Sequence, residues 1–358
     1  MRVRSTTPMI AVLLALLLAV ITTLVLSDRY FQGELLRVHG RAQTLVRDIE
    51  RIRYFDEVLT STARLGALTG ARRAGAATLL YAGEILSRPG VRGLAGRAVT
   101  RIAARRAGAV VAASNEVAKA YAGRGAAVSV VHPVIPPPPP AAELARLGGE
   151  LRAALGVAAD ERVVACLGAL TEGRGQRVLI EALARSRGRG HAPGWSVVIG
   201  GAAYERAPDR AYERRLREMV DELGLGGSVR FAGRVADPHA LYAAADVFAN
   251  PALVPEGFGR AACEALSCGC PVVSSTGGGV GEALADGETA LLVEPGSAEA
   301  LAAAIERLLG DRELAGRLAG AGAEDVARRL SPEAGQAEFE RALEAALAVR
   351  AASEPTSP

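Results

Sequence analysis

Apolar runs and amphipathic segments alternate along the second half of the sequence, and this alternation constrains the fold more than any other feature. Six short apolar runs are typical of buried strands: 163–167, 196–199, 229–232, 247–249, 271–274 and 290–293. The segments between most of them are helical in pattern: 177–186, 210–223, 239–244, 259–268 and 280–284. Strands that alternate with helices predict a parallel sheet covered on both faces. We therefore expect a doubly wound α/β domain over residues 151–330.

A second alternating series precedes this domain. Its expected strands are 56–61, 77–81, 109–113 and 127–131, and Ser114 with Asn115 is a helix-capping pair. This series predicts a further Rossmann-like domain over residues 28–135. Five consecutive prolines at 136–140 indicate a stiff linker, which we place at residues 136–150. A final helix and polar tail are expected over 331–358.

The N-terminal segment carries an uncharged run at 9–26, about long enough to cross a bilayer. We interpret residues 1–27 as a hydrophobic anchor helix. A cleavable signal peptide is the competing interpretation, although Asp28, Arg29 and Tyr30 follow the run in place of a small-residue cleavage site. Arginines flank the run on both sides, so the positive-inside rule leaves its direction open. Residues 35–52 predict an amphipathic helix that lies either on a membrane or on a sheet.

Composition excludes some functions. The formal net charge of +3 does not favour nucleic acid as a partner. Cys268 and Cys270 are separated by a single residue, which is the wrong spacing for a zinc knuckle. We expect the four cysteines to be small buried residues in a reducing compartment, and we expect no metal site.

Glycine-rich segments follow the expected strands, at 168–175, 200–201, 233–235 and 276–279. A glycine-rich loop that opens a helix exposes amides that can hold phosphate. The sequence has no G-x-x-x-x-G-K-[ST], and no G-x-G-x-x-G follows the first strand of either series. Both absences disfavour P-loop and nicotinamide-binding functions.

Two carboxylates, Glu256 and Glu264, accompany these loops. Gly257 and Gly259 leave bare amides at the start of the helix over 259–268. Glu264 lies in an otherwise apolar segment, where a charge needs a partner. A solvated glutamate pair is the simpler interpretation. Carboxylates for hydroxyl groups, beside amides and Arg174 for a diphosphate, are compatible with a nucleotide-sugar site.

The chain resembles the family 4 glycosyltransferases, which are retaining GT-B enzymes that use nucleotide-sugar donors. The E-x7-E motif of that family is matched by Glu256 and Glu264. Further matches are Gly233-Arg234-Val235, Ala245-Asp246-Val247-Phe248, Gly277-Gly278-Gly279 with Glu282, and Asp286-Gly287. The resemblance covers about residues 109–330. It implies a GT-B-like fold of two Rossmann-like doubly wound domains, the N-terminal one shortened and preceded by the anchor helix.

The resemblance also implies roles for individual residues. Glu256 contacts the donor sugar as the catalytic carboxylate, helped by the amides of Phe258 and Gly259, and Glu264 holds the ribose. The diphosphate is contacted by Arg174, which replaces the usual lysine, and by Gly175, Gly278 and Gly279, while the Val235 backbone faces the base. The donor is a UDP- or GDP-sugar, with no metal and no further cofactor.

The sequence departs from the family pattern at two positions. Ala169 stands where the family often carries a second diphosphate-binding arginine, and Ala82-Gly83-Glu84 lacks the histidine that many members place near the transferred sugar. We expect a membrane-anchored retaining hexosyltransferase that acts in the cytoplasm on saccharide or lipid-linked envelope acceptors. The alternatives are a non-catalytic or partner-dependent donor-binding subunit and a nucleotide-sugar epimerase.

Overall fold

The structure is a computed structural model that describes residues 79–83, 100–105, 107–124, 126–188, 194–204 and 206–353. The expected anchor over 1–27, the amphipathic helix over 35–52 and the strand over 56–61 lie outside these residues. Within the described ranges, no helix is long and apolar enough to cross a bilayer.

Six parallel strands form the larger sheet, and all six were expected from the sequence. They are β4 (Arg162–Leu167), β5 (Trp195–Gly200), β6 (Val229–Gly233), β7 (Val247–Asn250), β8 (Val272–Ser275) and β9 (Leu291–Val293). Their order is β6-β5-β4-β7-β8-β9, with β4 paired in parallel to both β5 and β7. The strand order therefore reverses beside β4, and open α/β sheets bind ligands at such a switch point.

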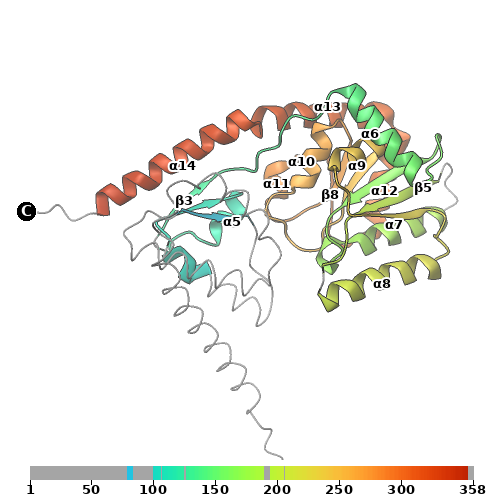
Figure 1. The fold of residues 1–358 in the computed structure, drawn as a ribbon, viewed down its shortest axis with the longest axis horizontal. Coiled ribbons are helices and arrows are strands. Elements are labelled where there is room, and N and C mark those ends of the chain that lie inside the picture. Colours follow the sequence, from blue (N-terminus) through green and yellow to red (C-terminus); the bar gives the residue numbers. More distant parts are fainter. Residues whose placement is uncertain are drawn as a thin grey trace, which may run out of the picture.

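Alternate side chains of each strand enter two different hydrophobic cores. Val164 belongs to the core beneath α7 (Gln176–Gly188), α8 (Ala207–Glu222) and α12 (Ala298–Gly310). Its neighbours Val163 and Ala165 belong to the core beneath α9 (Pro238–Ala244) and α10 (Arg260–Ser267). Figure 1 shows α7 and α8 on one side of this sheet and α9 and α10 on the other. Burial on both faces explains why these strands are apolar throughout.

The smaller sheet has three parallel strands in the order β1-β2-β3. They are β1 (Leu79–Ala82), β2 (Ala109–Ala112) and β3 (Ala127–Val130), which confirms three of the expected strands. Ser114 caps α5 (Asn115–Lys119), as expected, because its Oγ accepts a hydrogen bond from the Val117 amide at 3.1 Å. We call the described residues 79–131 the N-terminal unit.

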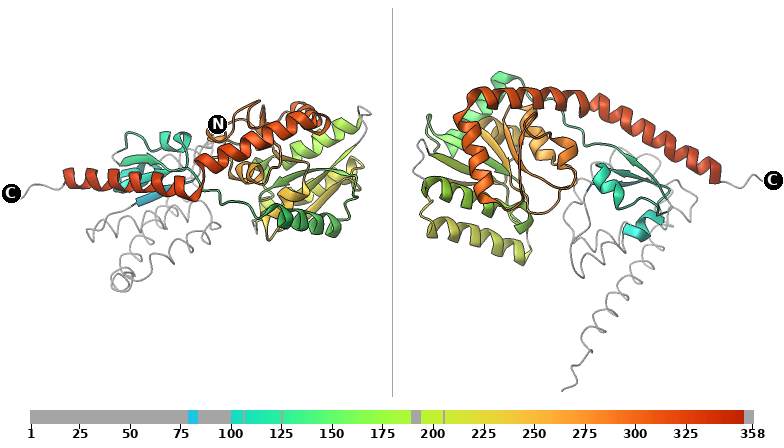
Figure 2. Two further views of the ribbon diagram at one scale, coloured as in Figure 1. Left: turned by 90° about the horizontal axis from the view of Figure 1, so that it is seen from above. Right: turned by 180° about the vertical axis from the view of Figure 1, so that it is seen from behind.

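The C-terminal helix joins the two sheets. After α13 (Arg312–Arg329), α14 (Pro332–Ser353) extends from the six-stranded sheet along the N-terminal unit (Figures 1 and 2). Ala342 of α14 packs with Val111 and Val131. At the crossing, the Ile135 amide donates to the Leu330 carbonyl at 2.8 Å. The chain thus crosses between the N-terminal unit and the six-stranded sheet twice, once near Ile135 and once after Leu330, and the two crossings lie side by side.

The proline run is extended, and α6 (Ala141–Ala154) begins directly after it. This helix packs closely on α9. A Cβ atom added at Gly148 would lie 2.6 Å from the Ala243 carbonyl oxygen, whereas one added at the adjacent Gly149 would meet nothing within 4 Å. The close approach of α6 to α9 therefore requires glycine at position 148 only.

We expect Gly148→Ala to lower the free energy of unfolding by about 1–3 kcal/mol, because the added methyl group forces the two helices apart. Gly149→Ala is the matched control, and it should stabilise the chain by up to about 1 kcal/mol through helix propensity. Denaturant unfolding of both variants measures the difference. Equal effects at the two positions would show that α6 and α9 are not in this contact.

Candidate functional site

The loops at the carboxyl ends of the six-stranded sheet contact one another through their backbones. Gly175 ends the short 3-10 helix η2 (Glu172–Arg174) with a φ of 71°, in the left-handed region. A Cβ atom there would lie 1.8 Å from the Pro251 carbonyl oxygen. Only glycine satisfies both the angle and the contact. This contact fixes Arg174, the preceding residue, beside the loop that carries Glu256.

Arg174 and Glu256 form an ion pair at the centre of these loops. The Asn250 amide also donates to Glu256 Oε2 at 2.6 Å and to Ser274 Oγ at 3.2 Å. The Glu256 side chain is 11% exposed and that of Arg174 is 46% exposed. Sequence reasoning placed Arg174 and Glu256 in one site but missed Asn250. A polar residue at the end of the apolar strand β7 was the available signal.

The Glu256 backbone pairs with the glycine loop that precedes α11 (Val280–Ala283). Glu256 and Gly278 form a parallel bridge, and the Gly279 amide donates to the Glu256 carbonyl at 2.8 Å. The Gly279 amide therefore already has an acceptor within the chain, and its expected contact with phosphate stays a prediction. Gly278 has a φ of 63°, and a Cβ atom there would lie 2.1 Å from the Glu256 carbonyl oxygen, so this position also requires glycine.

The start of α10 carries the bare amides that the sequence predicts. Gly259 is its N-cap, with a φ of 86° and no side-chain cap. No described residue accepts a hydrogen bond from the amide of Phe258 or Gly259. Because the helix dipole places positive charge at this end, the two amides are suited to an oxyanion or a hydroxyl oxygen.

Glu264 projects from α10 and has two protein partners. Tyr242 donates its hydroxyl to Glu264 Oε2 at 2.8 Å, and Arg260 Nε donates to Oε1 at 2.7 Å. Burial, together with the nearby Glu264 charge, raises the pKa of Tyr242, so this phenol stays a donor at neutral pH. The expectation that Glu264 needs a polar partner is confirmed, but the chain itself supplies two. The role of Glu264 toward a ribose stays a prediction.

Three other residues considered in the sequence follow the ends of strands. Val235 is partly buried and packs beside the end of β5, where a Cβ atom at Gly200 would lie 3.0 Å from it. The Ala169 carbonyl accepts from Gln176 Nε2 at 3.0 Å. Gly83 follows the end of β1. The contact of the Val235 backbone with a base stays a prediction.

The four cysteines are reduced, and three of them are buried: Cys166, Cys263 and Cys270. Burial raises the pKa of the Cys166 thiol to about 12. These three thiols are therefore poor nucleophiles at neutral pH, in agreement with the expected packing role. Cys268 is only partly buried, so the expectation of burial is wrong for this residue.

Glu282 of α11 connects the larger domain to the N-terminal unit. It accepts hydrogen bonds from the Asn115 amide and the Asn115 side chain, each at 2.8 Å, and from the Glu116 amide at 3.0 Å. His132 Nε2 lies 3.8 Å from Glu282 Oε2. Burial alone would raise the pKa of Glu282, but these donors and His132 outweigh it and lower the pKa. Sequence reasoning noted Glu282 in a motif and missed this contact.

His132 also contacts the loop that holds the bare amides. Its ring centroid lies 5.3 Å from that of Phe258, and its Nδ1 lies 3.0 Å from Glu338 Oε1 on α14. The N-terminal unit, α14 and the start of α10 therefore meet at this histidine.

Part of the chain is similar in sequence to known proteins. Residues 149–325 match the family described as "Glycosyl transferases group 1". A lipopolysaccharide core biosynthesis glycosyltransferase, LpsE of Rhizobium meliloti (strain 1021), is 37% identical over 183 residues, which are 51% of this chain and 50% of the relative. D-inositol 3-phosphate glycosyltransferase of Corynebacterium glutamicum (strain R) is 38% identical over 169 residues, which are 45% and 38% of the two chains. The chain spans half or less of the length of these curated relatives.

A solved structure is similar over a longer stretch. Anabaena Alr3699/HepE in complex with UDP and glucose has a TM-score of 0.70 and 25% identity, and the match covers 79% of this chain and 76% of that one. The chain thus has an α/β GT-B-like fold with parallel sheets.

We expect Glu282→Gln to lower the thermal unfolding midpoint at neutral pH, because charge-assisted hydrogen bonds contribute about 1.5–3 kcal/mol. The folded pKa of Glu282 lies below its ordinary value of 4.5. Its stabilisation is therefore complete above pH 4.5 and is lost as the pH falls through the folded value. The difference between wild type and variant should shrink in acid, while Glu222→Gln on α8 should change little. A pH-independent difference would contradict the assignment.

Proposed function

We propose that the chain transfers a sugar from a nucleotide-diphosphate sugar to a saccharide or lipid-linked envelope acceptor, because residues 149–325 match the family described as Glycosyl transferases group 1. The relatives include a lipopolysaccharide core glycosyltransferase and GDP-mannose-dependent mannosyltransferases that act on phosphatidylinositol monomannoside. We assign the transfer to the retaining family 4 enzymes on the basis of Glu256 and Glu264, spaced as in their motif.

The observation that carries this proposal is the contact between Arg174 and Glu256 beside the bare amides of α10. A guanidinium group and a carboxylate are the complementary halves of a site for a sugar diphosphate. When the donor binds, its diphosphate takes the Arg174 guanidinium, since planar forks bind phosphate oxygens well. Glu256, still held by Asn250, is then free to accept hydrogen bonds from sugar hydroxyls.

We assign the remaining contacts with the donor from the positions of the residues in the site. Glu264 accepts from the ribose hydroxyls, with Tyr242 and Arg260 fixing its orientation. The Val235 backbone faces the base. Gly175 and Gly278 allow the loops to approach the diphosphate closely, because neither carries a side chain. The donor is a UDP- or GDP-sugar.

The chemical step depends on stabilising the leaving diphosphate. Arg174 and the amides of Phe258 and Gly259 present positive charge where negative charge develops as the glycosidic bond to the diphosphate breaks. In this proposal the residues of the chain supply the stabilisation without a metal. The apolar run at 9–26 supports a membrane-associated enzyme, and we place its catalytic domain in the cytoplasm because nucleotide sugars are found there.

We expect UDP or GDP to raise the thermal midpoint of the full chain. A nucleotide at a hundred times its dissociation constant adds about 2.7 kcal/mol of stability. Arg174→Ala should weaken this binding by about tenfold or more, because a charge-assisted contact with the diphosphate is lost. Arg210→Ala on α8 is the control. If neither nucleotide shifts the midpoint, the donor site is wrongly assigned.

We expect Glu256→Gln to reduce sugar transfer by at least about a hundredfold while nucleotide binding stays within a few fold, since the carboxylate acts on the sugar and not on the diphosphate. Product analysis with a panel of UDP- and GDP-sugars measures both transfer and donor hydrolysis. A wild-type chain that binds donor but neither transfers nor hydrolyses it supports the non-catalytic alternative. Conversion of donor into an epimer supports the isomerase.

A further inference from the structure

His132 lies just past the carboxyl end of β3 and is held by one carboxylate of α14. Its backbone amide donates to Glu338 Oε2 at 2.8 Å, and its Nδ1 lies 3.0 Å from Glu338 Oε1. An ionised carboxylate only accepts hydrogen bonds, so we assign the proton to Nδ1. Because the same carboxylate binds both the backbone and the ring, the orientation of the imidazole is fixed.

The fixed imidazole packs on the ring of Phe258. The two ring centroids are 5.3 Å apart and the ring planes are tilted by 48°. This separation is typical of attractive aromatic pairs. Phe258 is only 3% exposed and belongs to the core beneath α9 and α10. That core and His132 together confine the Phe258 ring.

The position of the Phe258 ring matters for the bare amides at the start of α10. No side chain caps this helix. Gly257 and Gly259 flank Phe258, and glycine leaves the backbone conformationally free. The packing of the Phe258 ring therefore helps to set the direction of its own amide and of the Gly259 amide.

Docking of the N-terminal unit on the larger domain does not require the His132 ring. Glu282 already accepts three hydrogen bonds from Asn115 and Glu116 at the start of α5. The 3.8 Å between His132 Nε2 and Glu282 Oε2 is too long for a further one. The contact that the ring adds is therefore the one with Phe258.

We propose, on the basis of the function proposed above, that His132 is a positioning residue for sugar transfer. Held by Glu338, it packs on Phe258 and keeps the amides of Phe258 and Gly259 directed at the place where the leaving diphosphate gains charge. His132 itself contacts neither the donor nor the reacting atoms.

Steady-state turnover of UDP-glucose and GDP-mannose by the full chain, with calorimetric titration of UDP and GDP, tests this role. We expect His132→Ala to lower kcat for the donor that the wild type uses, and the affinity for the matching nucleotide, by about tenfold, because misdirected amides stabilise the diphosphate charge less well. The KM for the donor should stay within about threefold, since the intact donor does not yet carry that charge.

Two further substitutions separate the ring from its hydrogen bond. His132→Phe keeps an aromatic ring beside Phe258, and we expect its kcat to lie within about threefold of the wild-type value. His132→Gln keeps a donor for Glu338 but has no ring, and we expect it to be as slow as His132→Ala.

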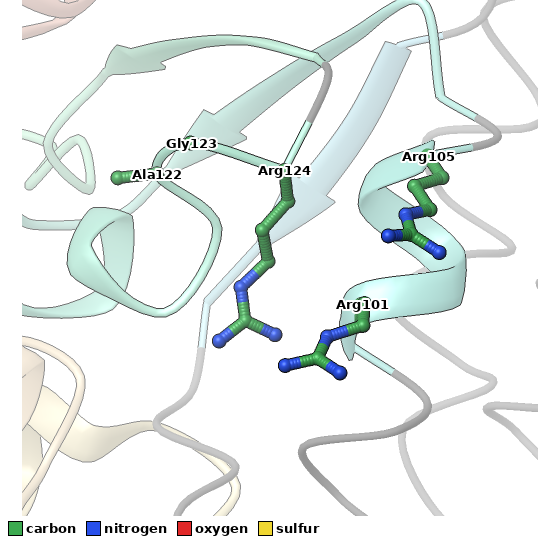
Figure 3. A pocket seen from close by; sticks show the side chains of 5 residues that line it. All are labelled: Arg101, Arg105, Ala122, Gly123 and Arg124. Atoms are coloured by element: carbon green, nitrogen blue, oxygen red, sulfur yellow. The ribbon is translucent and has the colours of Figure 1, made fainter.

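Arg101→Ala is the control in the same unit. Arg101 is exposed on the helical segment 100–105, where it lines a cavity with Arg105 and Arg124 (Figure 3). This segment precedes β2 and so borders the amino ends of the strands, whereas His132 lies past a carboxyl end. The control should leave kcat and nucleotide affinity within about twofold of wild type.

The outcomes separate the role of His132 from the proposed function. A wild type that binds neither nucleotide and turns over neither donor overturns both. A wild type that turns over a donor, with His132→Ala as active as Arg101→Ala or His132→Phe as slow as His132→Ala, overturns the role of His132 alone. If the wild type binds nucleotide without turnover, weaker binding by His132→Ala than by Arg101→Ala supports the role, and equal binding overturns it.

The thermal midpoint shows whether each variant is folded. Glu338→Ala replaces His132→Ala if that variant is not, and it should lower kcat and nucleotide affinity in the same direction because the imidazole is no longer held. A folded Glu338→Ala variant with wild-type kcat and nucleotide affinity would contradict the positioning role.

Discussion

The loops of the candidate site touch one another through their backbones, and the placement of Arg174 and Glu256 depends on this contact. Besides Gly175 and Gly278, a Cβ atom at Gly201 would lie 1.9 Å from the Gly168 oxygen, and one at Gly279 would lie 2.1 Å from the Gly257 oxygen. Loops in such contact cannot move independently. Arg174 precedes Gly175, and Glu256 pairs with Gly278, so both side chains are held in position before any ligand arrives, as binding and catalysis require.

The ion pair at the centre of the site is easily exchanged. Arg174 is nearly half exposed, and ion pairs with an exposed partner contribute only about 0–1 kcal/mol to stability. Replacing Glu256 by a diphosphate on Arg174 therefore costs little. Asn250 keeps Glu256 in place during the exchange, since it is anchored to Ser274 at the end of β8. In the proposed function, the site thus holds one charge for the diphosphate and one for the sugar before the donor binds.

The sequence predicts the strands of the larger domain well, because burial on both sheet faces makes them apolar throughout and glycine marks their ends. It also predicts bare amides at the start of α10, because Gly257 and Gly259 mark that start in the sequence. Side-chain partners far apart in sequence are different. The contact of Glu282 with Asn115 spans 167 residues, and nothing local to either residue indicates it. The acceptor of the Gly279 amide is missed for a related reason, because the Glu256 carbonyl oxygen belongs to another loop.

The two segments that connect the N-terminal unit to the larger domain are joined by the hydrogen bond from Ile135 to Leu330. These two connections determine how the N-terminal unit can rotate relative to the larger domain. A rotation about this pair of connections disturbs the connecting backbone least, so it defines a single axis. Glu338 of α14 holds His132, and the His132 ring packs against that of Phe258. A rotation of the N-terminal unit would therefore move His132 against Phe258, next to the amides that start α10. The angle between the N-terminal unit and the larger domain thus affects the geometry of the binding site.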